Sequence, residues 1–183
     1  MRQAHWLVWL VVLACSLAPN GASAQHHDPL NDKEIDQMRE AAEYPNKRLE
    51  LMTGFARARM ATIQQLQADK GAKERPTQIH DLLQDFIALL DEIDDNIDTY
   101  GSHKTDMRKG LKLVIEADSE WQLQLRKLKE QSPPEELHQY SFVLTNAIDA
   151  VKDTGESARK ELQEQNELAR NKKLNQVYSE RPE

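Results

Sequence analysis

The densest group of side chains able to do chemistry is a run of carboxylates in residues 76–103. Seven acids fall in this segment and no Lys or Arg does, so it accounts for most of the acidic excess behind the formal net charge of −7. Asp91, Asp94, Asp95 and Asp98 are spaced i, i+3, i+4 and i+7, which places them on one face of a helix. Like charges at this spacing repel one another. A hard cation such as Ca²⁺, which takes several carboxylate oxygens, would relieve that repulsion.

The ordinary interpretation of this face is a solvated surface, or one that is paired with neighbouring basic helices. A straight helix lacks the converging loop of a tight Ca²⁺ site. Two basic segments flank the acidic one, residues 45–60 and residues 104–112; their cations are Lys47, Arg48, Arg57 and Arg59 in the first and Lys104, Arg108, Lys109 and Lys112 in the second. We therefore expect no metal site in this chain, and if there is one, we expect it at Asp91, Asp94, Asp95 and Asp98.

Three shorter patterns match metal-binding signatures only in part. Residues 94–98 spell the DDxxD pattern that holds Mg²⁺ on a diphosphate in isoprenoid synthases, but the second acidic motif of those enzymes is missing. Glu135 and His138 form one Glu-x-x-His, whereas a di-iron bundle needs two of them and further Glu residues. Cleavage after Ala24 would make His27 the third residue, a position that can chelate Cu²⁺ or Ni²⁺. We interpret the first pattern as an acidic helix face, the second as the acidic first turn of a helix, and the third as a disordered leader.

Recognisable catalytic signatures are absent from the chain. It has no Gly-rich phosphate loop, no Gly-x-Ser-x-Gly and no His-Glu-x-x-His. The lone Cys15 cannot form an internal disulfide or a thiolate metal site. A net negative charge argues against nucleic-acid binding, because phosphate recognition needs clustered cations. The sequence therefore predicts a protein that is not an enzyme and takes no cofactor.

The N-terminus has the layout of a secretory signal peptide, predicted for residues 1–24. An apolar run over residues 6–15 is followed by a break at residues 19–21 and by a small-x-small cleavage site ending at Ala24. The run is too short to span a bilayer comfortably. Two alternatives remain open, a lipoprotein anchored at Cys15 and an uncleaved anchor. All three place the rest of the chain outside the cytoplasm. No transmembrane segment is expected in the mature chain that follows residue 24.

The remaining sequence is rich in good helix formers and shows no sustained period-two alternation. A flexible leader over residues 25–31 precedes the first expected helix, which either Asn31 or Asp32 can cap. Pro, Gly and Ser residues mark the breaks between helices, and Asp153-Thr154-Gly155 is a candidate kink. The expected helices are residues 32–43, 45–69, 77–100, 105–131 and 134–172. A disordered tail is expected over residues 173–183.

Each of the four long helices carries an apolar stripe at helical spacing. Four one-sided helices joined by short loops predict an all-α fold, an antiparallel bundle over residues 32–172. The short helix at residues 32–43 is expected to pack across one end or one side of this bundle. The stripe thins in the second half of the last helix, which we expect to protrude or to seek a partner as a coiled coil.

One polar pair is expected inside the bundle. Asp118 falls within the apolar stripe of its helix, where a carboxylate must find a partner or take up a proton. Arg59 lies on the apolar side of the helix predicted at 45–69. We predict that these two side chains meet in the interior, the alternative being that they sit at the stripe's edge and reach water.

Several segments between Asp28 and Ala169 carry a resemblance to other proteins, namely residues 45–49, 55–59, 79–83, 91–98 and 140–144. In these segments the chain resembles a group of uncharacterised exported helical proteins of bacteria. The resemblance implies export and helicity, and it transfers no functional residue.

The combined expectation is a non-enzymatic, exported protein of the periplasm or the extracellular space. It would act in the cell envelope by contact with a protein partner or by self-association, and it would bind no nucleic acid. The alternative is a weak divalent-cation or small-ligand binder that uses the acidic face of the helix at residues 77–100.

Overall fold

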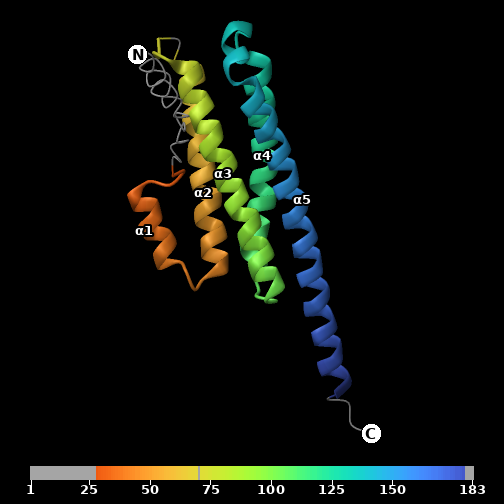
Figure 1. Ribbon diagram of the computed structural model, residues 1–183. Helices are drawn as coiled ribbons and strands as arrows, with labels where there is room; N and C mark the ends of the chain where they lie inside the picture. Colours follow the sequence, from red (N-terminus) through yellow and green to blue (C-terminus); the bar gives the residue numbers. More distant parts are fainter. Residues whose placement is uncertain (1–27, 70, 180–183) are drawn as a thin grey trace, which may run out of the picture.

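The computed structural model describes residues 28–69 and 71–179, and within them it confirms the predicted all-α fold. The described residues contain no strand; they form one short helix and four long ones (Figure 1). The helices are α1 (Asp32–Glu40), α2 (Pro45–Ala68), α3 (Arg75–Ser102), α4 (Arg108–Gln131) and α5 (Pro134–Ser179). The predicted signal peptide, its Cys15 alternative and the histidines of residues 25–27 lie outside the described residues.

Local backbone chemistry sets the helix ends. Asn31 caps α1 in a capping box with Glu34, so Asn31 is chosen over Asp32 as the cap. Lys104 takes a left-handed conformation with φ 54°, which is not helical. α4 therefore begins at Arg108 and not at the expected residue 105. In contrast, α5 runs unbroken through Gly155 and continues to Ser179, past the expected end at residue 172.

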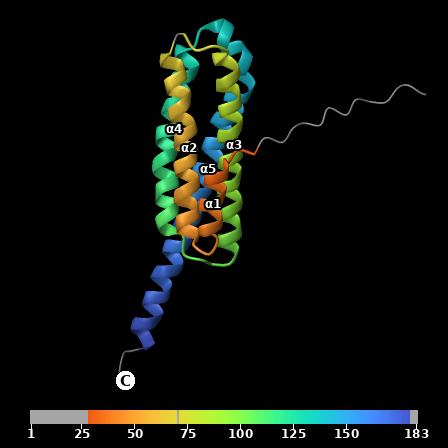
Figure 2. The ribbon, with the colours of Figure 1, turned by 90° about the vertical axis from the view of Figure 1, so that its left-hand side faces the viewer.

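The four long helices form a square in which α2 and α5 occupy opposite corners. α2 packs against α3 and α4, and α5 packs against the same two helices. Successive helices run in opposite directions (Figures 1 and 2). α3 and α4 are therefore diagonal neighbours, although they follow each other in sequence. Large side chains bridge that diagonal at one place: the rings of Phe86 and Trp121 meet edge to face in the core, with centroids 5.4 Å apart.

The connection between α3 and α4 must cross the end of the bundle, and one amide from each flanking helix holds it. Asn46 of α2 donates to the carbonyl of Asp106 and accepts from the amide of Gly110, at 2.7 Å and 2.8 Å. Gln165 of α5 accepts from the amide of Met107 at 3.1 Å and donates to the carbonyl of Thr105 at 2.9 Å. These bonds satisfy backbone groups that would otherwise be orphaned at a helix start.

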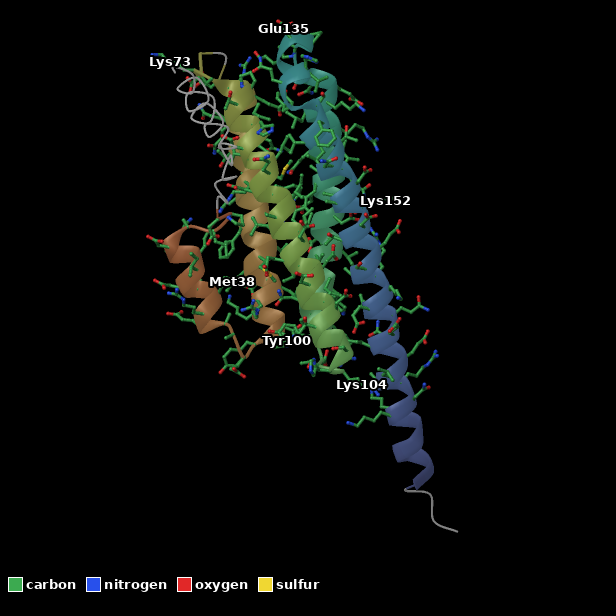
Figure 3. All side chains as sticks on the ribbon, viewed as in Figure 1. Met38, Lys73, Tyr100, Lys104, Glu135 and Lys152 are labelled. Carbon is green, nitrogen blue, oxygen red and sulfur yellow. The ribbon has the colours of Figure 1, made fainter. Side chains whose placement is uncertain are left out.

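The short helix α1 packs along one side of the bundle. Figure 2 shows α1 lying alongside the bundle, and Met38, which Figure 3 labels on α1, is buried. Arg48 of α2 donates to the carbonyl of Met38, and the hydroxyl of Tyr100 from α3 donates to the carbonyl of Ala42. Of the two placements expected from sequence, the structure therefore selects the side of the bundle over its end.

The C-terminal part of α5 projects beyond the end of the bundle, as the thinning stripe predicted (Figures 1 and 2). Within the described residues, Gln165 is the last residue of α5 whose side chain hydrogen-bonds to another part of the chain. We call residues 166–179 the overhang. No helix in the described parts of the chain combines the length and the apolar character needed to cross a membrane.

Candidate functional site

The acidic face on α3 is divided between solvent and a helix interface. Asp91, Asp95 and Asp98 are exposed. The pKa of Asp91 is raised, first because its carboxyl is partly removed from water and second because Asp95 lies close by. Within the described residues none of these three carboxylates forms an ion pair. This part of the face is a solvated, self-repelling surface.

Asp94 turns away from the other three acids toward α5. The hydroxyl of Thr154 donates to Asp94 Oδ2 at 2.7 Å, whereas Asp94 Oδ1 is buried and has no hydrogen-bond partner in the described structure. Burial raises the pKa of Asp94, the hydroxyls of Thr154 and Ser157 oppose that rise, and the charges of Asp98 and Asp91 add to it. Asp94 therefore serves the contact between α3 and α5.

The basic segments that flank α3 in sequence do little to neutralise it. Arg57 of α2 pairs with Glu120 of α4 at 3.0 Å. Arg108 pairs with Asp106, and the Arg108 guanidinium lowers the pKa of Asp106 to about 2. Among the described residues, Arg59 is the cation of these two segments that forms an ion pair with an α3 carboxylate. Its Nε lies 3.9 Å from Asp85 Oδ2. Asp85 precedes the acids at residues 91–98 on α3, so this contact does not neutralise them.

The partial metal signatures are not completed in space by the described residues. No group of three or more His, Cys, Asp or Glu side chains there is placed to hold a metal ion. Glu135 and His138 are both exposed at the start of α5. The DDxxD pattern is split, since Asp94 faces α5 while Asp95 and Asp98 face solvent.

The prediction that Asp118 is buried is confirmed, and the prediction that it meets Arg59 is wrong. Asp118 is 1% exposed on α4, where Arg159 of α5 and Gln122 donate to its carboxylate. The carboxylate lies so close to Gly155 of α5 that a Cβ there would meet it at 2.6 Å. The physical reason for the error is the square arrangement: the face of α2 that carries Arg59 looks toward α1 and α3.

Arg59 instead forms a bidentate ion pair with Glu34 of α1. Its two terminal nitrogens donate to the two carboxylate oxygens at 2.7 Å and 2.6 Å, and it also donates to the carbonyl of Pro29. The side chains of Arg59 and Glu34 are only 13% and 11% exposed. The pKa of Glu34 is lowered, above all by this hydrogen bond. The pair is the main ionic link between α1 and the bundle.

An open groove of about 540 Å³ lies where the overhang leaves the bundle. Lys104 lines it from the connection between α3 and α4, and Arg108 lines it from the start of α4; Figure 3 labels Lys104 at this end of the bundle. Glu164, Leu168 and Lys172 line it from α5, and Leu168 is 52% exposed. We call these three residues the overhang stripe; Leu168 and Lys172 lie on the overhang, and Glu164 lies two residues before it. The groove combines both signs of charge with one exposed aliphatic side chain.

Sequence reasoning missed Glu34 and Gln165, for different reasons. Glu34 stands three residues after Asn31, which is the spacing of a capping box, so its place at a helix start could have been found. Its second role, as partner of Arg59, depends on how α1 lies against α2. Gln165 is one of several glutamines on α5, and nothing local distinguishes it from the others.

Comparison with protein-family models, with curated proteins and with solved structures finds no match for this chain. The resemblance to exported bacterial helical proteins therefore stays a prediction.

Proposed function

We propose that this chain is a non-enzymatic, exported protein of the cell envelope that binds another protein through the end of α5. The observation that carries the proposal is the overhang, which continues past Gln165 and exposes Leu168. Most of the stability of a helix in a protein comes from its packing against other elements. A projecting helix end with an exposed aliphatic residue is therefore stabilised most by a partner that covers it.

The buried polar groups support a role in binding over one in catalysis. Asp118 is bound by Arg159, Glu34 is bound by Arg59, and Asn96 accepts from Arg48 at 2.9 Å. Each pair joins two different helices, so its side chains are committed to holding the bundle together. The proposal of export rests on the pattern of residues 1–24.

Truncation tests the proposal. A chain that ends after Gln165 keeps every hydrogen bond described between α5 and the other helices, so its melting temperature should match that of the full chain. It should nevertheless lose the protein that the full chain captures from an envelope extract. The matched control is Phe142→Ser, because Phe142 is 79% exposed near the other end of α5. If Phe142→Ser abolishes capture and the truncation does not, the proposed surface is wrong.

The second candidate is weak divalent-cation binding by the acidic face. It is favoured by the exposed carboxylates of Asp91, Asp95 and Asp98, which share one face of α3 and form no ion pair within the described residues. A bound ion would raise the melting temperature of the full chain progressively as Ca²⁺ passes its dissociation constant. The triple variant Asp91→Asn, Asp95→Asn, Asp98→Asn should abolish that rise. Equal melting in CaCl₂ and in NaCl of matched ionic strength would exclude this candidate.

A further inference from the structure

We propose that the overhang pairs with the overhang of a second copy of this chain, in an antiparallel crossing centred on Leu168. The inference rests on the proposed function and names the partner that the overhang contacts. Two observations carry it: the stripe that the overhang presents to the groove, and the order of the charges on that stripe.

The overhang stripe is self-complementary about its centre. Glu164, Leu168 and Lys172 are spaced i, i+4 and i+8, so they follow one side of α5 over ~12 Å. All three are exposed, and all three line the groove. An acid stands four residues before the exposed leucine and a base stands four residues after it. A two-fold axis through Leu168 therefore places Glu164 of each copy opposite Lys172 of the other.

The charges select an antiparallel pair over a parallel one. In an antiparallel pair the stripe gains two Glu–Lys contacts and one Leu–Leu contact, as expected for an isologous interface in which each contact occurs twice. A parallel pair would bring Glu164 against Glu164 and Lys172 against Lys172, which repel. The neighbouring charges follow the same order, since Glu161 and Glu167 are acidic whereas Arg170 and Lys173 are basic.

Helix packing rules give the crossing an expected angle. The stripe follows an i±4 row of α5, and helices that pack through such rows cross at about −50°. One crossing buries less than the ~1,200 Å² of a standard interface, so the dimer is weak.

A cysteine at the two-fold axis tests the pairing. In a full chain with Cys15→Ser, Leu168→Cys should form a disulfide-linked dimer about tenfold or more faster than the matched control, since pairing raises the effective thiol concentration. The control is Asn166→Cys, which is also exposed on the overhang but lies about 160° around the helix from residue 168. Equal rates for the two cysteines would overturn the proposal.

Charge reversal tests the orientation. In the Leu168→Cys chain, Glu164→Lys or Lys172→Glu alone should bring the rate of disulfide formation down to that of the Asn166→Cys control. The double variant should restore the rate, because it rebuilds both contacts with the signs exchanged. Failure of the double variant to recover would reject the antiparallel register, and so would single variants that react as fast as their parent.

One further measurement separates this inference from the proposed function. A photo-reactive amino acid at position 168 should give a covalent dimer of this chain when the full chain is expressed in cells. An adduct with a different protein, together with no Leu168→Cys dimer in the purified chain, would overturn self-pairing and leave the proposed function standing. The absence of any adduct at position 168 would overturn both.

Discussion

Gly155→Ala should destabilise the bundle by about 2–4 kcal/mol, although Ala is the better helix former. A Cβ at position 155 would lie 2.6 Å from the carboxyl carbon of Asp118 and 2.7 Å from both of its oxygens. Asp118 is 1% exposed and bound by Arg159, so its carboxylate cannot move away from the new Cβ without disturbing this ion pair. Either α4 and α5 move apart or the pair breaks. Chemical denaturation with fluorescence detection measures the loss.

Two variants make this result specific to the contact. Gly54→Ala on α2 is the matched control: its Cβ would meet nothing within 4 Å, so it should stabilise the protein by about 0.5–1 kcal/mol. In the double variant, Asp118→Ala vacates the space that the new methyl group needs. The free energy of unfolding of the double variant should exceed, by about 1.5 kcal/mol or more, the value obtained by adding the effects of the two single variants. A Gly155→Ala protein as stable as the Gly54→Ala protein would contradict the close packing of α4 on α5.

The helices and their buried faces could be predicted from the sequence because they depend on local order. The stripe of α3 includes Leu83, Phe86 and Leu90, all of which are fully buried. The spacing of Asp118 within the stripe of α4 likewise placed it correctly in the interior. Both results follow from a period of 3.6 residues, which needs no knowledge of the neighbouring helices.

The partners of these faces could not be predicted, because periodicity does not say which helix a face meets. A square of four helices in which α3 and α4 were adjacent would satisfy the same stripes. The observed diagonal depends on the connection at residues 103–107 and on the amides of Asn46 and Gln165 that hold it. The wrong pairing of Asp118 with Arg59 has the same origin: Arg57, two residues earlier, is the arginine that reaches α4.

In the candidate site, too, the spacing of the residues predicted which face they share, but not which neighbouring side chains they contact. The sequence placed Asp91, Asp94, Asp95 and Asp98 on one face of a helix, and their exposure follows that face at three positions. It could not show that Asp94, at the edge of the face, would accept a hydrogen bond from Thr154 across the interface with α5. Whether the three exposed acids bind a cation is a property of solution, which the melting experiment addresses.

Arg59→Met should release α1 from the bundle. The free energy of unfolding should fall by an amount at the lower end of the ~3–5 kcal/mol expected when a buried ion pair loses one partner. Met keeps the apolar stem but leaves the Glu34 carboxylate, 11% exposed, without its guanidinium. The loss is limited because α1 packs chiefly on α2 and can detach without unfolding the four long helices. Amide hydrogen exchange should therefore accelerate in residues 32–40 far more than in α3 or α4. Arg39→Met is the control, since Arg39 is 75% exposed in an ion pair on the surface of α1.

Lowering the pH should weaken the stabilisation that the Glu34–Arg59 pair gives to the docking of α1. The pKa of Glu34 is lowered in the folded protein, first by the bond from Arg59, so the pair stabilises docking of α1 fully above the unfolded value of ~4.3. That stabilisation is lost as the pH falls through the lowered folded pKa. Without Arg59, desolvation dominates at Glu34 and favours the neutral carboxyl, so acidification should improve docking of α1 in the Arg59→Met protein. The raised pKa of Asp94 is common to both proteins and cancels in their difference. Protection factors for residues 32–40 that fall equally in both proteins between pH 7 and pH 3 would show that Glu34 and Arg59 do not hold α1.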